Sequence, residues 1–345
     1  MDSHEVIIIG SGPSGLAIAA LLNKNKIENI ILEKESIFGG TYAIINPDIF
    51  LLSPGKFNAL PLVKGEWKND SITVGEYYNY LVNYKESQKI NIQYNTKIIQ
   101  ILPFEQGYKL ISESGKEYLC KKLIMATGMI SFPNKQKFNY QENPDVEFQL
   151  AKEFKGNEYY RGKNVLILGS GTSAIEIATL LAGISNVYLA IKEQLITFPL
   201  FIMGINTHYF IQYLEKIPIK YLKKRCDGKW THPGLDFGIN EAINNEQVIL
   251  CNNEFILKNN IARFNDQKEF NVDIFINATG YNFETGILPA KKKRKKNGLA
   301  DTTENESTSH KNLFILGHPC AGGLDSPFLR GIRKDVYRIL NKLQK

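Results

Sequence analysis

Cysteine pairs are missing from this sequence. Its four cysteines, Cys120, Cys226, Cys251 and Cys320, form no CxxC motif, which excludes a zinc ribbon and a thioredoxin-type dithiol. Scattered cysteines are typical of a reducing cytosol. No apolar run approaches the roughly 18 residues that a membrane span needs, and the acidic N-terminus does not have the pattern of a signal peptide. We therefore predict a cytoplasmic protein without a membrane span.

A broad basic surface is missing as well. Lysine and arginine number 42 against 35 acidic residues, a net charge of +7, and the single run Lys291–Lys296 supplies six positive charges. Such a run of like charges is typical of a solvated loop. Without interleaved aromatic residues it is poor evidence for base recognition. The sequence therefore predicts no nucleic-acid partner.

What the sequence does contain is one nucleotide-binding pattern, present twice. The first copy runs from an apolar stretch at residues 5–9, through a glycine-rich turn, into a segment with apolar residues at helical spacing. In such a turn the first glycine permits a tight bend, the second lets a pyrophosphate approach the backbone, and the third lets the helix pack closely on the strand. The helix N-terminus then offers amide groups and a positive dipole end to phosphates. These roles fall on Gly10, Gly12, Pro13, Ser14 and Gly15.

The second copy occupies residues 164–192, where a strand at residues 164–168 precedes another glycine-rich turn and helix. Alanine at the third glycine position is an accepted variant of the motif. The nucleotide-binding positions of this turn are Gly169, Gly171, Thr172 and Ser173.

The residue that follows the second strand differs in charge between the two copies. Glu33 and Lys192 each lie 23 residues after the first glycine of their own copy. A carboxylate there can accept hydrogen bonds from ribose hydroxyls and repels a 2′-phosphate, whereas a cation attracts one. We therefore predict FAD in the first copy and NADPH in the second. For Lys192 the alternative of a solvated lysine at a strand end stays open.

Two later apolar stretches repeat in the same way. Residues 122–128 and 273–280 both end in Ala-Thr-Gly. A buried strand that runs into Thr-Gly lets the backbone press against a dinucleotide. The pattern adds Ala126, Thr127 and Gly128 to the predicted FAD site and Thr279 and Gly280 to the predicted NADPH site.

With both copies in place, the chain resembles the flavoproteins with two dinucleotide-binding domains, and within them the short bacterial relatives of the flavin-containing monooxygenases. The segments that carry this resemblance are residues 33–41 (EKESIFGGT), 52–61 (LSPGKFNALP), 73–81 (TVGEYYNYL), Ala-Thr-Gly with Pro133, and 328–335 (FLRGIRKD). The resemblance adds to the FAD site Lys34, Gly40, Thr41, Gly317, Asp325 and Phe328. It also implies two catalytic polar groups near the flavin ring, Ser53 and Asn58.

The resemblance implies an α/β fold with two Rossmann-like, three-layer ββα domains, the NADPH domain inserted into the FAD domain. The FAD domain then comprises residues 1–130 and 278–345, and the NADPH domain residues 160–277, with residues 131–160 as a connector. Alternating apolar and polar residues over 90–119 indicate hairpins. Before the C-terminal helix, Ser326 is expected to be the N-cap and Pro327 the first helical residue.

The implied activity is oxygenation of a small organic molecule by an FAD enzyme that takes hydride from NADPH. Two departures from the family weaken this: residues 146–163 lack the Phe-Gly-His signature of these monooxygenases, and Thr41 replaces a common tryptophan. A reductase that passes electrons to an organic or thiol acceptor is therefore an alternative, and a non-catalytic FAD-binding accessory protein a remoter one. Homodimerisation stays open. We expect Cys320 to be an isolated packing residue and His208, His232 and His318 to be structural.

Overall fold

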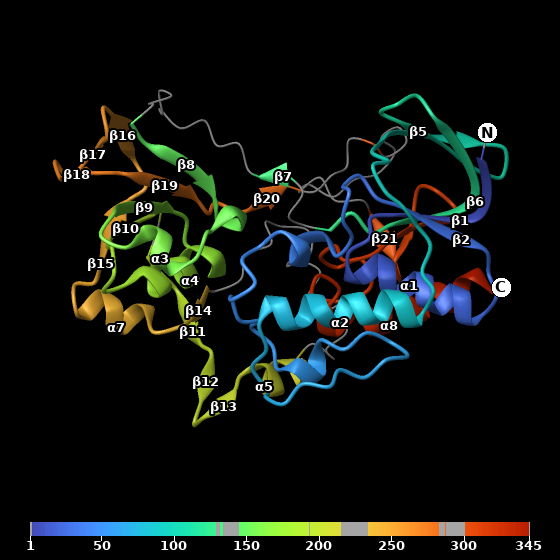
Figure 1. Ribbon diagram of the computed structural model, residues 1–345, viewed down its shortest axis with the longest axis horizontal. Helices are drawn as coiled ribbons and strands as arrows, with labels where there is room; N and C mark the ends of the chain where they lie inside the picture. Colours follow the sequence, from blue (N-terminus) through green and yellow to red (C-terminus); the bar gives the residue numbers. More distant parts are fainter. Residues whose placement is uncertain are drawn as a thin grey trace. The chain divides into compact units, whose positions relative to one another are not determined.

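The computed structural model describes residues 2–128, 132–133, 145–192, 194–214, 234–282, 287 and 301–344. The chain divides into two compact units (Figure 1). Unit 1 comprises Met1–Phe132, His208–Trp230 and Phe283–Lys345, and unit 2 comprises Pro133–Thr207 and Thr231–Asn282. The run Lys291–Lys296 lies outside the described residues.

Unit 1 is built on a nine-stranded sheet whose centre is parallel. The central order is β23-β6-β1-β2-β3, and the antiparallel strands β21 and β22 extend the sheet beyond β23. Strands β4 and β5 form a meander with β6, as the sequence predicts for residues 90–119. The strands are β1 (Asp2–Ile9), β2 (Asn29–Leu32), β3 (Ile92–Gln93), β4 (Ile98–Phe104), β5 (Gly107–Ser112), β6 (Glu117–Met125), β21 (Thr302–Thr303), β22 (Glu306–Ser307) and β23 (Leu313–Ile315).

Alternation along β1 separates the two faces of this sheet. Val6 and Ile8 face a core shared with the helices, whereas Ile7 and Ile9 face a core shared with the β4–β5–β6 meander. Since both faces are covered, β1 is apolar throughout its buried half. The helices of unit 1 are α1 (Pro13–Lys24), η1 (Gly40–Ala43), η2 (Gly55–Phe57), α2 (Val74–Ser87), α5 (His208–Leu214) and α8 (Leu329–Leu343), and α1, α2 and α8 lie together on one face (Figure 1).

Unit 2 repeats this plan on a smaller scale. Its five-stranded parallel sheet has the order β15-β10-β9-β19-β8, and a separate three-stranded meander of β16, β17 and β18 packs on one face. The helices are η3 (Ala151–Glu153), α3 (Asn157–Tyr160), α4 (Thr172–Leu181) and α7 (Ile239–Asn244). The sheet and meander strands are β8 (Glu147–Leu150), β9 (Asn164–Leu168), β10 (Asn186–Ile191), β15 (Val248–Asn252), β16 (Phe255–Lys258), β17 (Ile261–Phe264), β18 (Glu269–Asn271) and β19 (Ile274–Asn277).

Shorter strands complete the described chain. Strand β11 (Thr197–Pro199) pairs with β14 (Gly234–Asp236) and β12 (Phe201–Ile202) with β13 (Ile205–Asn206). Strands β7 (Phe132–Pro133) and β20 (Tyr281–Asn282) contain two residues each. None of the helices in the described ranges is long and apolar enough to cross a membrane.

Two sequence expectations about local structure are wrong. Residues 147–160 are not a connector, because β8 pairs with β19 and forms the edge of the second sheet. Ser326 does not cap α8, which begins at Leu329 with Phe328 as its N-cap. The Ser326 hydroxyl instead accepts hydrogen bonds from the backbone amides of Gly322 and Gly323, at 3.0 and 2.7 Å.

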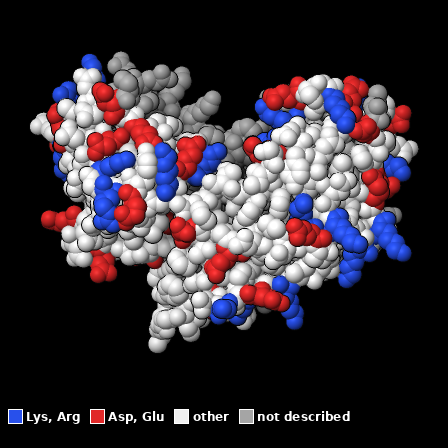
Figure 2. Space-filling view, viewed as in Figure 1, with Lys and Arg blue, Asp and Glu red and all other residues white. Residues whose placement is uncertain are grey.

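On the face shown in Figure 2, acidic and basic side chains alternate over the described surface, and neither sign dominates a large area there. This distribution is compatible with the prediction that the chain does not bind nucleic acid through a basic face.

Candidate cofactor-binding sites

The first glycine turn is shaped by close backbone contacts. Gly10 has a φ of +100°, and a Cβ on it would lie 2.6 Å from the carbonyl oxygen of Ala126. A Cβ on Gly15 would lie 2.0 Å from the carbonyl oxygen of Gly10. Only glycine fits at these two positions, because any side chain would force β1, α1 and β6 apart.

Gly12 is different, because it faces open space. It has an extended backbone (φ −68°, ψ 179°), and a Cβ on it would meet no atom within 4 Å. Gly12 is the N-cap of α1, no side chain caps this helix, and its first turn contains no acid. Gly40, with a φ of +58°, comes close to Gly12, since its Cβ would lie 3.2 Å from the Gly12 Cα. The two glycines therefore border a recess at a helix N-terminus that suits an anionic pyrophosphate.

Glu33 follows the last residue of β2 and is only 5% exposed. Its Oε2 atom accepts hydrogen bonds from the Ser11 backbone amide at 2.8 Å and from the Ser11 hydroxyl at 2.5 Å, and its Oε1 atom accepts one from the Glu35 amide at 3.0 Å. These bonds hold the carboxylate at the edge of the sheet beside the glycine turn. Because each carboxylate oxygen can accept more than one hydrogen bond, ribose hydroxyls can still bind.

The other predicted FAD residues of the first unit lie in the segment after β2 and in the loops after β6 and β23. Lys34 is exposed and ion-paired with Glu35 at 3.5 Å, and Thr41 lies in η1 after the two loop glycines. Gly128, after Thr127, has a φ of +72°. Gly317 also has a φ of +72°, and its Cβ would lie 3.3 Å from the Ser14 hydroxyl. The structure thus brings the loop after β23 against the first turn of α1.

Ser53 and Asn58, the two predicted catalytic residues, are hydrogen-bonded to one another. The Ser53 hydroxyl donates to Asn58 Oδ1 at 2.6 Å, and Asn58 Nδ2 donates to the Ser53 carbonyl oxygen at 3.0 Å. Asn58 is completely buried. The guanidinium of Arg333 in α8 donates to the carbonyl oxygen of Ala59 at 3.2 Å, which ties this segment to the C-terminal helix.

A row of tyrosines on α2, which the sequence analysis missed, anchors the same segment. The Tyr80 hydroxyl accepts from the Leu60 amide at 2.8 Å, and the Tyr84 hydroxyl donates to the Pro61 carbonyl oxygen at 2.9 Å. Tyr77 belongs to the same row, and its hydroxyl is buried without a hydrogen-bond partner among the described residues. Burial raises the pKa of all three phenols. The spacing of three and four residues was the signal available in the sequence.

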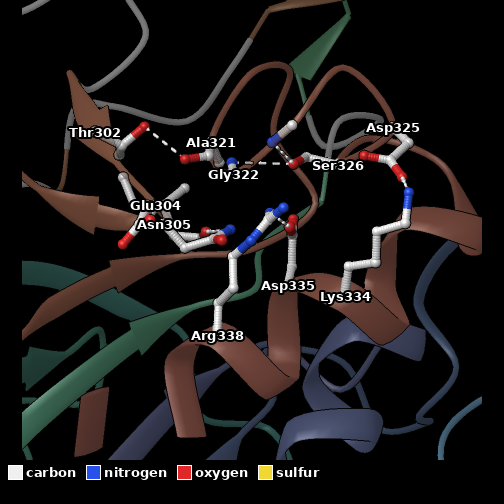
Figure 3. A network of polar contacts seen from close by, with 12 residues as sticks. Thr302, Glu304, Asn305, Ala321, Gly322, Asp325, Ser326, Lys334, Asp335 and Arg338 are labelled. Carbon is white, nitrogen blue, oxygen red and sulfur yellow. Dashed lines mark hydrogen bonds and ion pairs between the residues drawn. The ribbon is translucent and has the colours of Figure 1, made fainter. Parts of the chain in front are cut away.

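Asp325 and Phe328, both predicted to belong to the FAD site, lie just before α8: Asp325 is in the loop that leads into the helix (Figure 3) and Phe328 is the helix N-cap. Asp325 is 3% exposed and forms an ion pair with Lys334. The guanidinium of Arg330 lies over the ring of Phe328, 4.2 Å from its centre. The Asp325 carboxylate is therefore already engaged by α8, and its role toward a ribityl chain stays a prediction.

The second glycine turn reproduces the geometry of the first. Gly169 has a φ of +142°, and its Cβ would lie 2.4 Å from the carbonyl oxygen of Ala278 in the second Ala-Thr-Gly segment. Gly171 is extended (φ −84°, ψ 174°), caps α4 without a side-chain hydrogen bond, and has nothing within 4 Å of its Cβ position. The first turn of α4, which contains Thr172 and Ser173, has no acid. This turn is therefore also suited to a pyrophosphate.

Beyond the turn the two units differ. Lys192 directly follows β10 and is exposed, whereas the corresponding Glu33 is buried. Thr279 donates from its amide and hydroxyl to Asn277 Oδ1 at 3.1 and 2.7 Å, and Gly280 has a φ of +89°. Burial raises the pKa of Glu176, in the second turn of α4, to about 7.

Two histidines and two cysteines of the first unit are buried, namely His208, His318, Cys120 and Cys320. Burial lowers the pKa of His318 to about 4, and burial together with the Arg330 charge lowers that of His208 to about 4, so both are neutral at pH 7. His232 lies outside the described residues. Cys320 is disulfide-bonded, so our expectation of an isolated packing cysteine is wrong. Within the described ranges, no group of three metal-ligating side chains could hold a metal ion.

Comparison with known proteins gives four informative similarities, which are one family profile, two relatives in sequence and one solved structure. The sequence profile of the family "Pyridine nucleotide-disulphide oxidoreductase" matches residues 7–200. The chain is 25% identical to the oxidoreductase CzcO of Bacillus subtilis, over 99% of both chains, and 26% identical to the probable indole-3-pyruvate monooxygenase YUCCA1 of Arabidopsis thaliana, over 81% of this chain and 75% of that one. The flavin-containing monooxygenase of Stenotrophomonas maltophilia has the same fold, with a TM-score of 0.81 at 16% identity, covering 100% of this chain and 99% of that chain.

Proposed function

Because this chain belongs to the pyridine nucleotide-disulphide oxidoreductase family, we propose that it is a flavin enzyme in which unit 1 binds FAD and unit 2 binds NADPH. The observation that carries this proposal is the repeated geometry of the two glycine turns. In each unit a helix N-cap glycine borders open space. The glycine that follows the preceding strand packs closely against the alanine of an Ala-Thr-Gly segment. Two such recesses on two sheets suit two dinucleotides.

FAD supplies the redox chemistry by accepting a hydride from the nicotinamide ring. The chain's own residues bind and orient the cofactors. The N-terminus of α1, with Gly12, binds the FAD pyrophosphate. The Glu33 carboxylate accepts hydrogen bonds from the ribose hydroxyls. The segment that contains Ser53 and Asn58 is anchored by the α2 tyrosines and by Arg333, and in our proposal it would lie beside the flavin ring. Two rigid helices thus hold the polar pair in place.

Lys192 is proposed to select NADPH over NADH. Its exposed ammonium stands where the first unit has Glu33, and a charge-assisted contact to a 2′-phosphate stabilises binding by roughly 1.5–3 kcal/mol. Lys192→Ala should therefore raise the KM for NADPH by about tenfold or more and leave that for NADH nearly unchanged. Steady-state kinetics with both cofactors measure this.

Lys268→Ala is the matched control for this variant, because Lys268 is a lysine of the same unit that pairs with Asp266 at 3.1 Å in a turn. It should change neither KM. Equal losses for NADPH and NADH in Lys192→Ala would contradict the assigned role.

We further propose that the electrons serve oxygenation of a small organic molecule. NADPH, a proton, oxygen and substrate would give NADP⁺, water and a product with one added oxygen atom. One support is the similarity, over 81% of this chain, to a protein named as a monooxygenase. A second is the hydrogen-bonded Ser53–Asn58 pair in the segment at residues 52–61.

Without a substrate, the enzyme should still consume NADPH and oxygen and release hydrogen peroxide. We expect one peroxide for each NADPH, because no other acceptor is present. An oxygen electrode and a peroxidase-coupled assay measure the two quantities. Reduced enzyme that resists oxygen for minutes would be incompatible with the oxygenase proposal.

One observation favours the reductase alternative, namely that Cys320 is disulfide-bonded in the loop that follows β23. In that case the reduced enzyme should be reoxidised quickly by a disulfide or a quinone and slowly by oxygen. Stopped-flow reoxidation with each acceptor separates the two activities.

A further inference from the structure

The loop between β23 and α8 rests on a cluster of buried polar side chains (Figure 3). At its centre lies Asp335 of α8, which is completely buried. Arg338, one turn later, donates from Nη1 to Asp335 Oδ1 at 2.8 Å. Figure 3 shows both side chains pointing from the helix toward the backbone of the loop at Gly322.

Gly322 sits directly on this cluster. A Cβ on Gly322 would lie 2.1 Å from Asn305 Oδ1, 2.4 Å from Asp335 Oδ1 and 2.7 Å from Arg338 Nη1. Three polar atoms from two elements therefore touch the loop backbone at one residue. The loop cannot shift toward α8, and only glycine fits at this position.

The flanking residues of the loop are fixed by hydrogen bonds. The Asn305 amide donates to the Ala321 carbonyl oxygen at 2.8 Å, and the Thr302 hydroxyl donates to the same oxygen at 3.1 Å. Asn305 Nδ2 donates to the Ile315 carbonyl oxygen at 3.0 Å, so this buried asparagine links the loop to β23. On the other side, the Ser326 hydroxyl accepts from two loop amides.

Stability alone does not account for such a cluster. An ion pair that takes a carboxylate out of water is weak evidence for stability, because the buried charge loses its hydration, and here the Arg338 side chain stays 36% exposed while Asp335 is buried. Asp335 bears this cost visibly, since burial raises the pKa of its carboxyl group and its Oδ2 atom has no hydrogen-bond partner among the described residues. Hydrogen bonds and ion pairs have a preferred direction, whereas apolar contacts do not. A charged cluster can therefore fix the position of the loop backbone more specifically than an apolar one.

The supported loop lies where the FAD is expected. It begins at the carboxyl end of β23, which pairs in parallel with β6 at the centre of the sheet, and dinucleotides bind outside this edge of such sheets. Near its start, a Cβ on Gly317 would lie 3.3 Å from the Ser14 hydroxyl of α1, and the helix that follows the loop reaches Ala59 through Arg333. The loop thus connects two parts of the predicted FAD site, the glycine turn before α1 and the segment that contains Ser53 and Asn58.

We propose that Asp335 and Arg338, together with Asn305 and Gly322, form a positioning cluster that fixes the FAD-facing loop and thereby sets FAD affinity and the reduction potential of the bound flavin. This inference rests on the proposed function. Asp335, Arg338 and Asn305 lie against the loop backbone at Gly322, and in our proposal they act on the cofactor through the backbone of residues 321–323.

The test compares three variants with the wild-type full-length protein: Asp335→Asn, Arg338→Met and the milder Ser326→Ala. The readouts are the FAD dissociation constant, the flavin midpoint potential, and amide hydrogen exchange of residues 321–323 in the apoprotein. We expect faster exchange of these amides and FAD binding weakened by about tenfold in the first two variants. Because backbone donors favour the more negative reduced flavin, a tenfold greater loss for the reduced form lowers the potential by about 30 mV.

Lys342→Met is the matched control. Lys342 also belongs to α8 and also holds the β21–β22 hairpin, through the Thr303 carbonyl oxygen at 3.1 Å and Glu306 at 3.4 Å. Among the described residues, its hydrogen bonds and ion pairs do not include the loop at residues 320–326. Its variant should have wild-type FAD affinity and wild-type potential.

Three results would overturn the proposal: variants with wild-type affinity and potential, variants that only melt at lower temperature, or a control with the same losses. If Asp335→Asn and Arg338→Met fail to fold, Ser326→Ala decides alone, because its hydroxyl accepts from the Gly322 and Gly323 amides of the same loop: faster exchange of these amides with weaker FAD binding supports the proposal, and faster exchange with wild-type FAD binding overturns it. An error in the proposed function would look different, since the wild-type protein would then bind no FAD at all.

Discussion

Replacement of Gly12 by valine is expected to give a folded protein that no longer retains FAD. The extended backbone of Gly12 is one that valine adopts readily, and a Cβ there meets no protein atom within 4 Å, so the fold has no reason to change. The branched side chain would occupy the space in which the pyrophosphate must lie. Loss of two charge-assisted hydrogen bonds, each worth about 1.5–3 kcal/mol, weakens binding by at least about a hundredfold.

Absorbance near the flavin bands and equilibrium binding to the apoprotein measure this effect. Far-ultraviolet circular dichroism checks that the variant is folded. Gly12→Ala is the graded control, because its single methyl group should weaken binding less than valine does. A valine variant that keeps its full complement of FAD would show that the first glycine turn is not the FAD site.

The reciprocal expectation concerns Gly171. Gly171→Val should keep FAD but lose reduction by NADPH, with the KM for NADPH raised by at least about a hundredfold for the same physical reason. The backbone of Gly171 is extended, and its Cβ position is open, as at Gly12. The protein should remain yellow, and dithionite should still reduce it at the wild-type rate.

Anaerobic stopped-flow reduction with NADPH measures the loss. The two valine variants control for one another, since each should spare the function of the other unit. A Gly171→Val enzyme that NADPH reduces normally would show that the second turn binds no nicotinamide cofactor. Loss of FAD in this variant would instead indicate that the two units depend on each other.

Much of the fold could be predicted from the sequence because the glycine turns encode local geometry. Gly10 and Gly169 each have positive φ, and each lies against the carbonyl oxygen of the alanine in an Ala-Thr-Gly segment. Because both motifs occur twice in the sequence, the same contact forms in both units. The hairpins around Gly107 and Gly115 were also predictable from local features, since a Cβ on Gly107 would lie 2.0 Å from the Cys120 carbonyl oxygen and Gly115 has a φ of +80°. These features depend on few residues and on short-range sterics.

The errors arose where tertiary contacts decide the outcome. The sequence around residues 145–160 is polar, yet β8 forms because the edge of β19 offers it a partner. Ser326 followed by proline predicts a helix start, but its hydroxyl is taken by two loop amides. Local preference was overridden in both cases.

The sequence proposes the backbone positions of the candidate site but not the contacts that support them. Glu33 was proposed because its register repeats, and its role toward a ribose stays a prediction. The contact of Arg333 with Ala59, and that of Gly322 with Asn305, join residues that no local pattern relates. A single sequence offers no signal for such pairs, because the side chains involved are ordinary in type and spacing.

The order of the strands has a consequence for how the protein is made. Leu313 of β23 pairs with Leu123 of β6, 190 residues earlier, and α8 then packs on α1. Synthesis on the ribosome proceeds at about 5–20 residues per second. The sheet of unit 1 therefore cannot be completed by β23 until all of unit 2 has been synthesised. During that interval unit 2, which needs no strand from the C-terminal segment, can fold first. The nucleotide site proposed in unit 1 is thus encoded first and completed last, and we expect FAD to bind fully only after β23 and α8 have left the ribosome.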